Sequence, residues 1–304
     1  MPIFRNEFPD IKWLKNEINN RFQRKEGWPN VIINTLSNQA YRPDIKGPLS
    51  LFMNIKGESA CSVGRHFSRI LESQYFLSNQ GENYTLEIEN PGTETFNIHF
   101  GEKFLEQVYQ ALILPEDKIL SNPEDSLTSL EFYSKLYEKD EKLFNWIQDF
   151  YKTLNSGYCP DLFIEEQLTE LLKYLLRVHR NIVKDVAKLP AAKASTREEL
   201  YKRMLPSLDY MESYYDRDIN LDELAQISFI SKYHYLRLFK AAFKITPHQY
   251  LLNVRMRRAK GLLEKSDLPV GEVARRVGFE ELSSFSRLFY KKEGVWPGRY
   301  RENR

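Results

Sequence analysis

The sequence predicts an α+β fold in two domains, with an antiparallel β-sandwich or small barrel in the N-terminal half and an all-α domain at the C-terminus. Three observations predict it. Apolar residues alternate with a period of two between Val31 and Phe100, as they do in half-buried strands. From Glu102 onward they recur at helical spacing. After Asp218 one residue pattern occurs twice, which indicates two similar helical units.

The composition is that of a folded chain with one basic end. The 304 residues are 42% hydrophobic and 13% aromatic, and the net charge is +2. This length allows two domains with separate cores. From Asp218 to the end, 17 Lys and Arg stand against 10 Asp and Glu, so the rest of the chain is acidic. A basic end on an acidic body is expected where that end meets nucleic acid.

Targeting and metal-site signals are missing from the sequence. The first 15 residues lack the apolar core of a signal peptide, and no apolar run is long enough to cross a membrane. Cys61 and Cys159 make no disulfide framework, and no cluster of His and Cys has the spacing of a zinc site. We therefore expect a reduced, cytoplasmic protein with no membrane contact, no cofactor and no metal.

The N-terminal domain is expected to span residues 1–190. Short strand-like runs separated by turn-forming segments fill residues 31–101, and helical segments follow over residues 102–190. The last helical segment carries a regular apolar stripe, which fits either a helix packed on its own β-domain or a dimer seam. The stripe consists of Leu168, Leu171, Leu172, Leu175, Leu176, His179 and Val183.

The β-region is a candidate small-molecule site, because the mouth of a β-structure is a common place for a pocket. Metal-dependent enzymes of this architecture need a closely spaced His pair, whereas the two histidines of this region are 33 residues apart. We therefore predict no catalytic residues. For each candidate liner a plain core position is the competing interpretation. The candidate effector-binding residues are Phe52, Arg65, His66, Tyr75, Tyr84 and His99.

A segment of small residues separates the two domains. We expect a linker at residues 191–197, and Thr196 with Glu199 has the spacing of a capping box that starts the next helix. The second domain is then residues 198–304. In it the pattern R-x-F-x7-P-x2-Y runs from Arg237 to Tyr250 and again from Arg287 to Tyr300. Each copy predicts a helix, a short turn and a second helix.

The second helix of each copy presents arginine, aromatic and small polar residues on its outer face. Such a face suits the major groove, where Arg bonds guanine and apolar atoms contact thymine methyls. Leu236 and Leu282 lie on this face, which is expected to be exposed to solvent. An apolar side chain there contributes no stability unless a partner covers it, which favours a binding surface. The alternative is two helix pairs whose charges are merely solvated. The candidate DNA-binding residues are Lys232, Tyr233, Leu236, Arg237, Lys240, Leu282, Ser283, Ser286, Arg287, Tyr290 and Arg301.

Roughly the last hundred residues resemble the double helix-turn-helix domain of the AraC/XylS transcription regulators. The resemblance is carried by the linking helix Tyr250–Leu263, the Gly278-Phe279 pair and the P-x2-Y-R motif that ends at Arg301. It implies two recognition helices in successive major-groove faces and a cupin-like barrel in the N-terminal domain. In two places the sequence departs from the family pattern. Lys244 replaces a glycine, and Glu281 replaces a small polar cap.

The resemblance implies a sequence-specific transcription regulator, activating or repressing, that is switched by a small-molecule effector in the barrel. The expected partners are double-stranded promoter DNA, the effector and a second copy of the chain, with RNA polymerase as a further candidate. Two alternatives stay open. One is a cupin-type enzyme tethered to a DNA-binding domain, and the other is a ligand-free regulator controlled by a partner protein.

Overall fold

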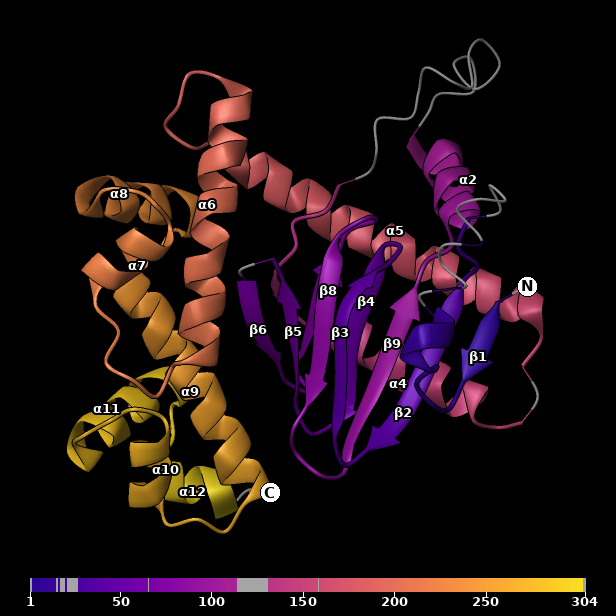
Figure 1. The fold of residues 1–304 in the computed structure, drawn as a ribbon. Coiled ribbons are helices and arrows are strands. Elements are labelled where there is room, and N and C mark those ends of the chain that lie inside the picture. Colours follow the sequence, from indigo (N-terminus) through magenta and orange to yellow (C-terminus); the bar gives the residue numbers. More distant parts are fainter. Residues whose placement is uncertain are drawn as a thin grey trace. The chain divides into compact units, whose positions relative to one another are not determined.

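The computed structural model describes residues 2–14, 16, 20, 27–64, 66–113, 131–157 and 159–302. The chain divides into two compact units, Met1–Val183 and Lys184–Arg304, and each has its own hydrophobic core. The N-terminal unit contains the sheets and the C-terminal unit is helical (Figure 1). In these described ranges no helix is long and apolar enough to cross a bilayer.

The described strands of the N-terminal unit form two sheets. The larger sheet has the order β1-β2-β9-β4-β7-β10, and the smaller has the order β3-β8-β5-β6. Only the pairing of β1 with β2 is parallel among these ladders. The strands are β1 (Ile3–Arg5), β2 (Val31–Ser37), β3 (Ala40–Lys46), β4 (Ser50–Lys56), β5 (Ser59–Val63), β6 (His66–Ile70), β7 (Gln74–Ser78), β8 (Asn83–Ile88), β9 (Thr93–His99) and β10 (Leu136–Glu138).

The predicted closed barrel is wrong, because no ladder joins the two sheets over the described residues. The larger sheet is instead buried on both faces. On β4, Leu51 and Met53 belong to the core shared with the helices, whereas Phe52 between them belongs to the core shared with the smaller sheet. A sheet that is covered by helices on one face and by a second sheet on the other buries its apolar residues without closing on itself.

Helices cover the face of the larger sheet that is remote from the smaller sheet. They are α2 (Glu102–Ile113), α4 (Glu141–Leu154) and α5 (Asp161–Val186), and α5 runs behind the strands (Figure 1). Phe150 of α4 packs edge-on against Phe96 of β9, with 6.1 Å between ring centroids. The leucines of the α5 stripe, from Leu168 to Leu176, are buried in this same core. The stripe therefore packs on its own β-domain, which leaves those leucines unavailable as a dimer seam.

The C-terminal unit consists of two helix pairs that are joined by a long helix. A further long helix precedes the first pair, and a short helix follows the second. The helices are α6 (Ala194–Ser213), α7 (Leu221–Ile227), α8 (Lys232–Phe243), α9 (Pro247–Lys265), α10 (Val270–Arg276), α11 (Leu282–Glu293) and α12 (Pro297–Glu302). Helix α9 begins with a complete capping box between Thr246 and Gln249. The capping box expected at Thr196 is not formed, because α6 starts three residues earlier, with Lys193 at its N-cap.

Candidate nucleic-acid interface

The first helix pair, α7 and α8, is held by the inner face of α8. Tyr235, Leu238 and Phe239 are buried there, and the Tyr235 hydroxyl lies 2.8 Å from Ser207 Oγ on α6. Because residues three and four apart share a helix face, this burial turns the opposite side of α8 outward. On that side Arg237, Lys240 and Lys232 are exposed, and Tyr233 is 85% exposed.

Arg237 is free to contact a ligand, because its acidic neighbours are engaged elsewhere. Asp222 forms an ion pair with Lys232, and Glu223 accepts a hydrogen bond from the Tyr210 hydroxyl. No side chain in the described part of the chain forms an ion pair with Arg237. The Lys232 ion pair is exposed on both sides, so it contributes little to stability and can open when a phosphate approaches.

The second pair, α10 and α11, has the same arrangement but packs against a different helix, α9. Phe285 and Phe289 of α11 are buried in a core made with α9 and α10. Leu282 is 47% exposed, Ser283 is exposed and Ser286 is half-buried. The exposed Arg287 donates from Nε to the Ser283 carbonyl at 3.3 Å. Tyr290 stacks on Trp296, with 4.7 Å between ring centroids.

Leu236 and Arg301 are less exposed than the sequence pattern suggested. Leu236 is half-buried and lines a small apolar pocket with Leu224 of α7 and Leu251 of α9. Its exposure is therefore no longer an argument for a contact with DNA. Arg301 is also half-buried, and its guanidinium donates to the Leu268 carbonyl. That bond ties α12 to the segment before α10, which gives Arg301 a structural role whatever its contact with DNA.

Sequence reasoning overlooked two residues that shape these pairs. Phe229, between α7 and α8, is 77% exposed and has a positive φ of 52°. It occupies the place of Gly278 in the second pair, so aligning the two copies would have found it. Arg255 of α9 donates to the carbonyls of Tyr215 and Arg217, each at 2.7 Å, and so fixes the segment that precedes α7.

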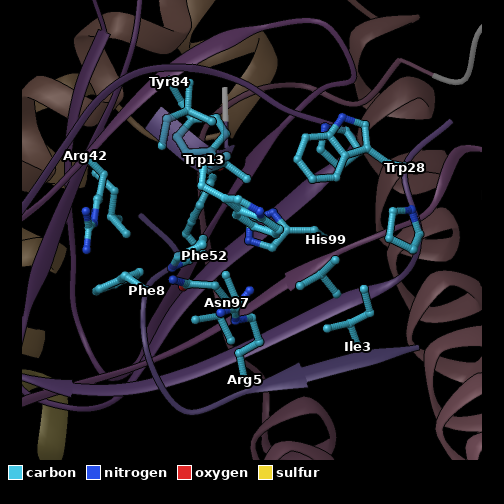
Figure 2. A pocket seen from close by; sticks show the side chains of 18 residues that line it. Ile3, Arg5, Phe8, Trp13, Trp28, Arg42, Phe52, Tyr84, Asn97 and His99 are labelled. Carbon is cyan, nitrogen blue, oxygen red and sulfur yellow. The ribbon is translucent and has the colours of Figure 1, made fainter. Parts of the chain in front are cut away.

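A separate pocket lies in the N-terminal unit, between the two sheets and the N-terminal segment (Figure 2). Of the candidate effector residues, Phe52, Tyr84 and His99 line it. Tyr75 lies on the opposite face of the larger sheet, stacked on Tyr137 at 5.0 Å between centroids. His66 is half-buried on β6 and does not line the pocket, and Arg65 lies outside the described residues. The pocket residues that the sequence did not single out include Arg5, Trp13, Trp28, Arg42 and Asn97.

Comparison with known proteins agrees with the helix pairs. The family described as "Helix-turn-helix domain" matches residues 224–303, which contain α8 through α11. The probable transcriptional regulator LumQ of Photobacterium leiognathi is 32% identical over 148 residues, covering 44% of this chain and 58% of that protein. The Msm operon regulatory protein of Streptococcus mutans is 23% identical over 267 residues, covering 81% and 90%. Residues 224–303 therefore form a helix-turn-helix domain of the AraC type.

Among solved structures, this AraC-type chain is similar to the C-terminal domain of AraT, a response regulator from Geobacillus stearothermophilus. The two are 30% identical, the match covers 34% of this chain and 85% of that domain, and the TM-score is 0.32. The AraC-type chain spans about half the length of several curated relatives that it matches.

Proposed function

We propose that this AraC-type chain is a sequence-specific transcription regulator that binds double-stranded promoter DNA with α8 and α11. The observation that carries the proposal is the equivalence of Arg237 and Arg287. Each is exposed near the middle of the second helix of its pair, and neither has an acidic partner within the described chain. An exposed guanidinium on a helix that fits the major groove can bond guanine O6 and N7 together.

Several side chains around the two arginines add to this surface. Tyr233, Lys240 and Leu282 extend the outer faces of α8 and α11, and they offer phosphate contacts and apolar contacts with thymine methyls. The basic balance after Asp218 supports the same use. LumQ and the Msm protein, two of the relatives that match this chain, are named as regulators, which supports regulation in preference to catalysis.

A small molecule bound in the pocket of the N-terminal unit is the proposed effector. To act as a switch it must favour one arrangement of the DNA-binding unit over another, because a ligand with equal affinity for both states changes nothing. A homodimer would have to use a surface other than the buried leucines of α5. RNA polymerase would meet the regulator at the promoter.

The proposal is tested by selecting bound sequences from a random DNA pool with the full chain and then footprinting the winners. Two helices on one linking helix should protect two short sites about 10 bp apart on one face of the duplex. The affinity should also fall with salt, with a log-log slope of about −0.9 for each phosphate contacted. Protection of one short site alone would assign one helix pair a purely structural role, and a slope near zero would overturn DNA binding.

A further inference from the structure

The pocket of the N-terminal unit has apolar walls and room for a small organic molecule. Its volume is ≈ 80 Å³, on a scale where one water needs roughly 10–15 Å³. Phe52 and Tyr84 face it from the two sheets, while Phe8, Trp13 and Trp28 come from the segments before β2 (Figure 2). Aromatic side chains on several sides favour a ligand with a flat or bulky apolar body.

Two arginines give this apolar pocket a positive charge. The guanidinium carbon of Arg42 lies 5.1 Å from the ring centroid of Phe8, and that of Arg5 lies 5.3 Å from the ring of Trp13. Arg42 Nε is buried without a hydrogen-bond partner. Neither arginine has an ion pair within the described chain, and no Asp or Glu is found among the described lining residues. Ring contacts only partly replace water around a cation, and among the described residues no anion balances these two charges.

Among the described lining residues the other polar side chains, His99 and Asn97, are neutral. Ser50 Oγ lies 2.8 Å from the Pro48 carbonyl and 2.8 Å from His99 Nδ1. Since the single hydroxyl proton of Ser50 goes to Pro48, the histidine donates from Nδ1, which leaves Nε2 as an acceptor. Burial lowers the pKa of His99 to about 4, which keeps the ring neutral near pH 7. Asn97 is also buried, and no described residue hydrogen-bonds to its side-chain amide.

We propose that this pocket binds a small amphipathic anion, a molecule with an apolar, ring-sized body and one carboxylate or phosphate group. The anionic group meets the forked donors of Arg42 and Arg5, since a guanidinium matches both groups in two parallel hydrogen bonds. The apolar body lies among Trp13, Trp28 and Phe52. A neutral polyol would leave the two positive charges unmatched. The regulatory meaning of this ligand rests on the proposed function, but its binding does not.

The experiment measures the intrinsic fluorescence of the full chain, because Trp13 and Trp28 line the pocket and report its occupation. The probes are phenylacetate, phenyl phosphate, the neutral phenylacetamide and acetate, which has no ring. At least one of the first two should bind about tenfold or more tightly than the amide and acetate, and the better of the two identifies the anionic group. Equal binding of phenylacetamide, or binding of none of the probes, would overturn the proposal.

Variants separate the charge of the pocket from its fold. Arg42→Gln should weaken binding of the anion at least about tenfold and weaken binding of phenylacetamide much less, and Arg5→Gln should act in the same direction. Arg180→Gln is the matched control, because Arg180 is exposed on α5 outside the pocket. If both pocket variants bind the anion like the control, the proposal fails. DNA binding is measured on the same samples. Anion binding without DNA binding would reject the proposed function alone, and DNA binding without anion binding would reject the ligand alone.

Discussion

The two helix pairs of the C-terminal unit share one residue pattern but make their turns differently. The turn residue of the second pair, Gly278, has φ 81°, and a Cβ placed there would lie 2.9 Å from the Asp216 carbonyl oxygen and from Arg255 Cζ. The equivalent Phe229 adopts φ 52° in the first pair and is mostly exposed. The turn by itself therefore tolerates a large residue. Glycine becomes necessary where another backbone segment packs directly on the turn.

The pairs also differ in the carboxylate that accepts a hydrogen bond from their equivalent tyrosines, Tyr250 and Tyr300. The Tyr250 hydroxyl donates to Glu212 at 2.9 Å. Glu212 is 3% exposed and is also paired with Arg257. In the second pair the hydroxyl of Tyr300 donates to Glu264, which is exposed. Buried polar networks are costly to break and exposed ones are not. Equivalent positions of the repeat should therefore contribute unequally to stability.

The largest expected difference lies at the two turns. Gly278→Ala should lower the free energy of unfolding by about 3 kcal/mol, because it adds a left-handed penalty to a clash with a backbone carbonyl. Phe229→Gly should instead raise it by about 0.5–1 kcal/mol. Urea unfolding of the full chain, with hydrogen exchange of the α10 and α11 amides, measures both. If the decrease for Gly278→Ala is no larger than the increase for Phe229→Gly, backbone φ and not packing controls the stability of both turns.

Helices α8 and α11 give a second comparison, in the proposed DNA binding. Arg237→Ala should weaken the preferred DNA site by about 1–3 kcal/mol and relax selectivity at one base position, since the side chain makes no internal ion pair. Arg287→Ala should relax selectivity at a position about 10 bp away. A panel of one-base variants of the site, with a melting curve for each protein, is the measurement. A lowered melting temperature with equal loss on all DNA would mean that Arg237 is structural.

The shared tyrosines give a third comparison. Tyr250→Phe should cost about 1–2 kcal/mol, because it removes a donor from a buried carboxylate. Tyr300→Phe should cost less than about 0.5 kcal/mol, since water replaces the hydroxyl next to exposed Glu264. Chemical denaturation of the two variants under the same conditions checks this. If the two costs are equal, the Glu212 network contributes nothing beyond an exposed hydrogen bond.

The smallest expected effect lies at the ends of α8 and α11. Both helices end in a left-handed residue, Lys244 with φ 63° and Gly294 with φ 75°. Lys244→Gly should raise stability by about 0.5–1 kcal/mol, and Gly294→Ala should lower it by about 1 kcal/mol. No described atom lies within 4 Å of a Cβ at Gly294, so backbone conformation alone sets the size of that change. Thermal melting of both variants would show opposite shifts, and shifts of the same sign would contradict the prediction.

The sequence alone was enough for the helix pairs and for the outward position of Arg237 and Arg287. Their short-range pattern determines both the helix and the face that it buries, because the residues three and four apart carry the signal. The same reasoning overstated the exposure of Leu236, which falls on the outer side of the α8 pattern but is half-buried and lines a pocket with Leu224 and Leu251 from other helices. A helix pattern shows which side is apolar and does not show which neighbours reach around it.

In the N-terminal unit only the tertiary structure decided the fold of the sheets and the composition of the pocket. Strand β7 is buried along its whole length and β4 over residues 50–54, and a strand covered on both faces has no alternation to reveal which face is which. Phe52 and Tyr75 therefore looked equivalent, although they point to different cores. Arg42 and Asn97 meet at one pocket because distant segments pack together there. Nothing local in either segment encodes that meeting, so it required the folded chain.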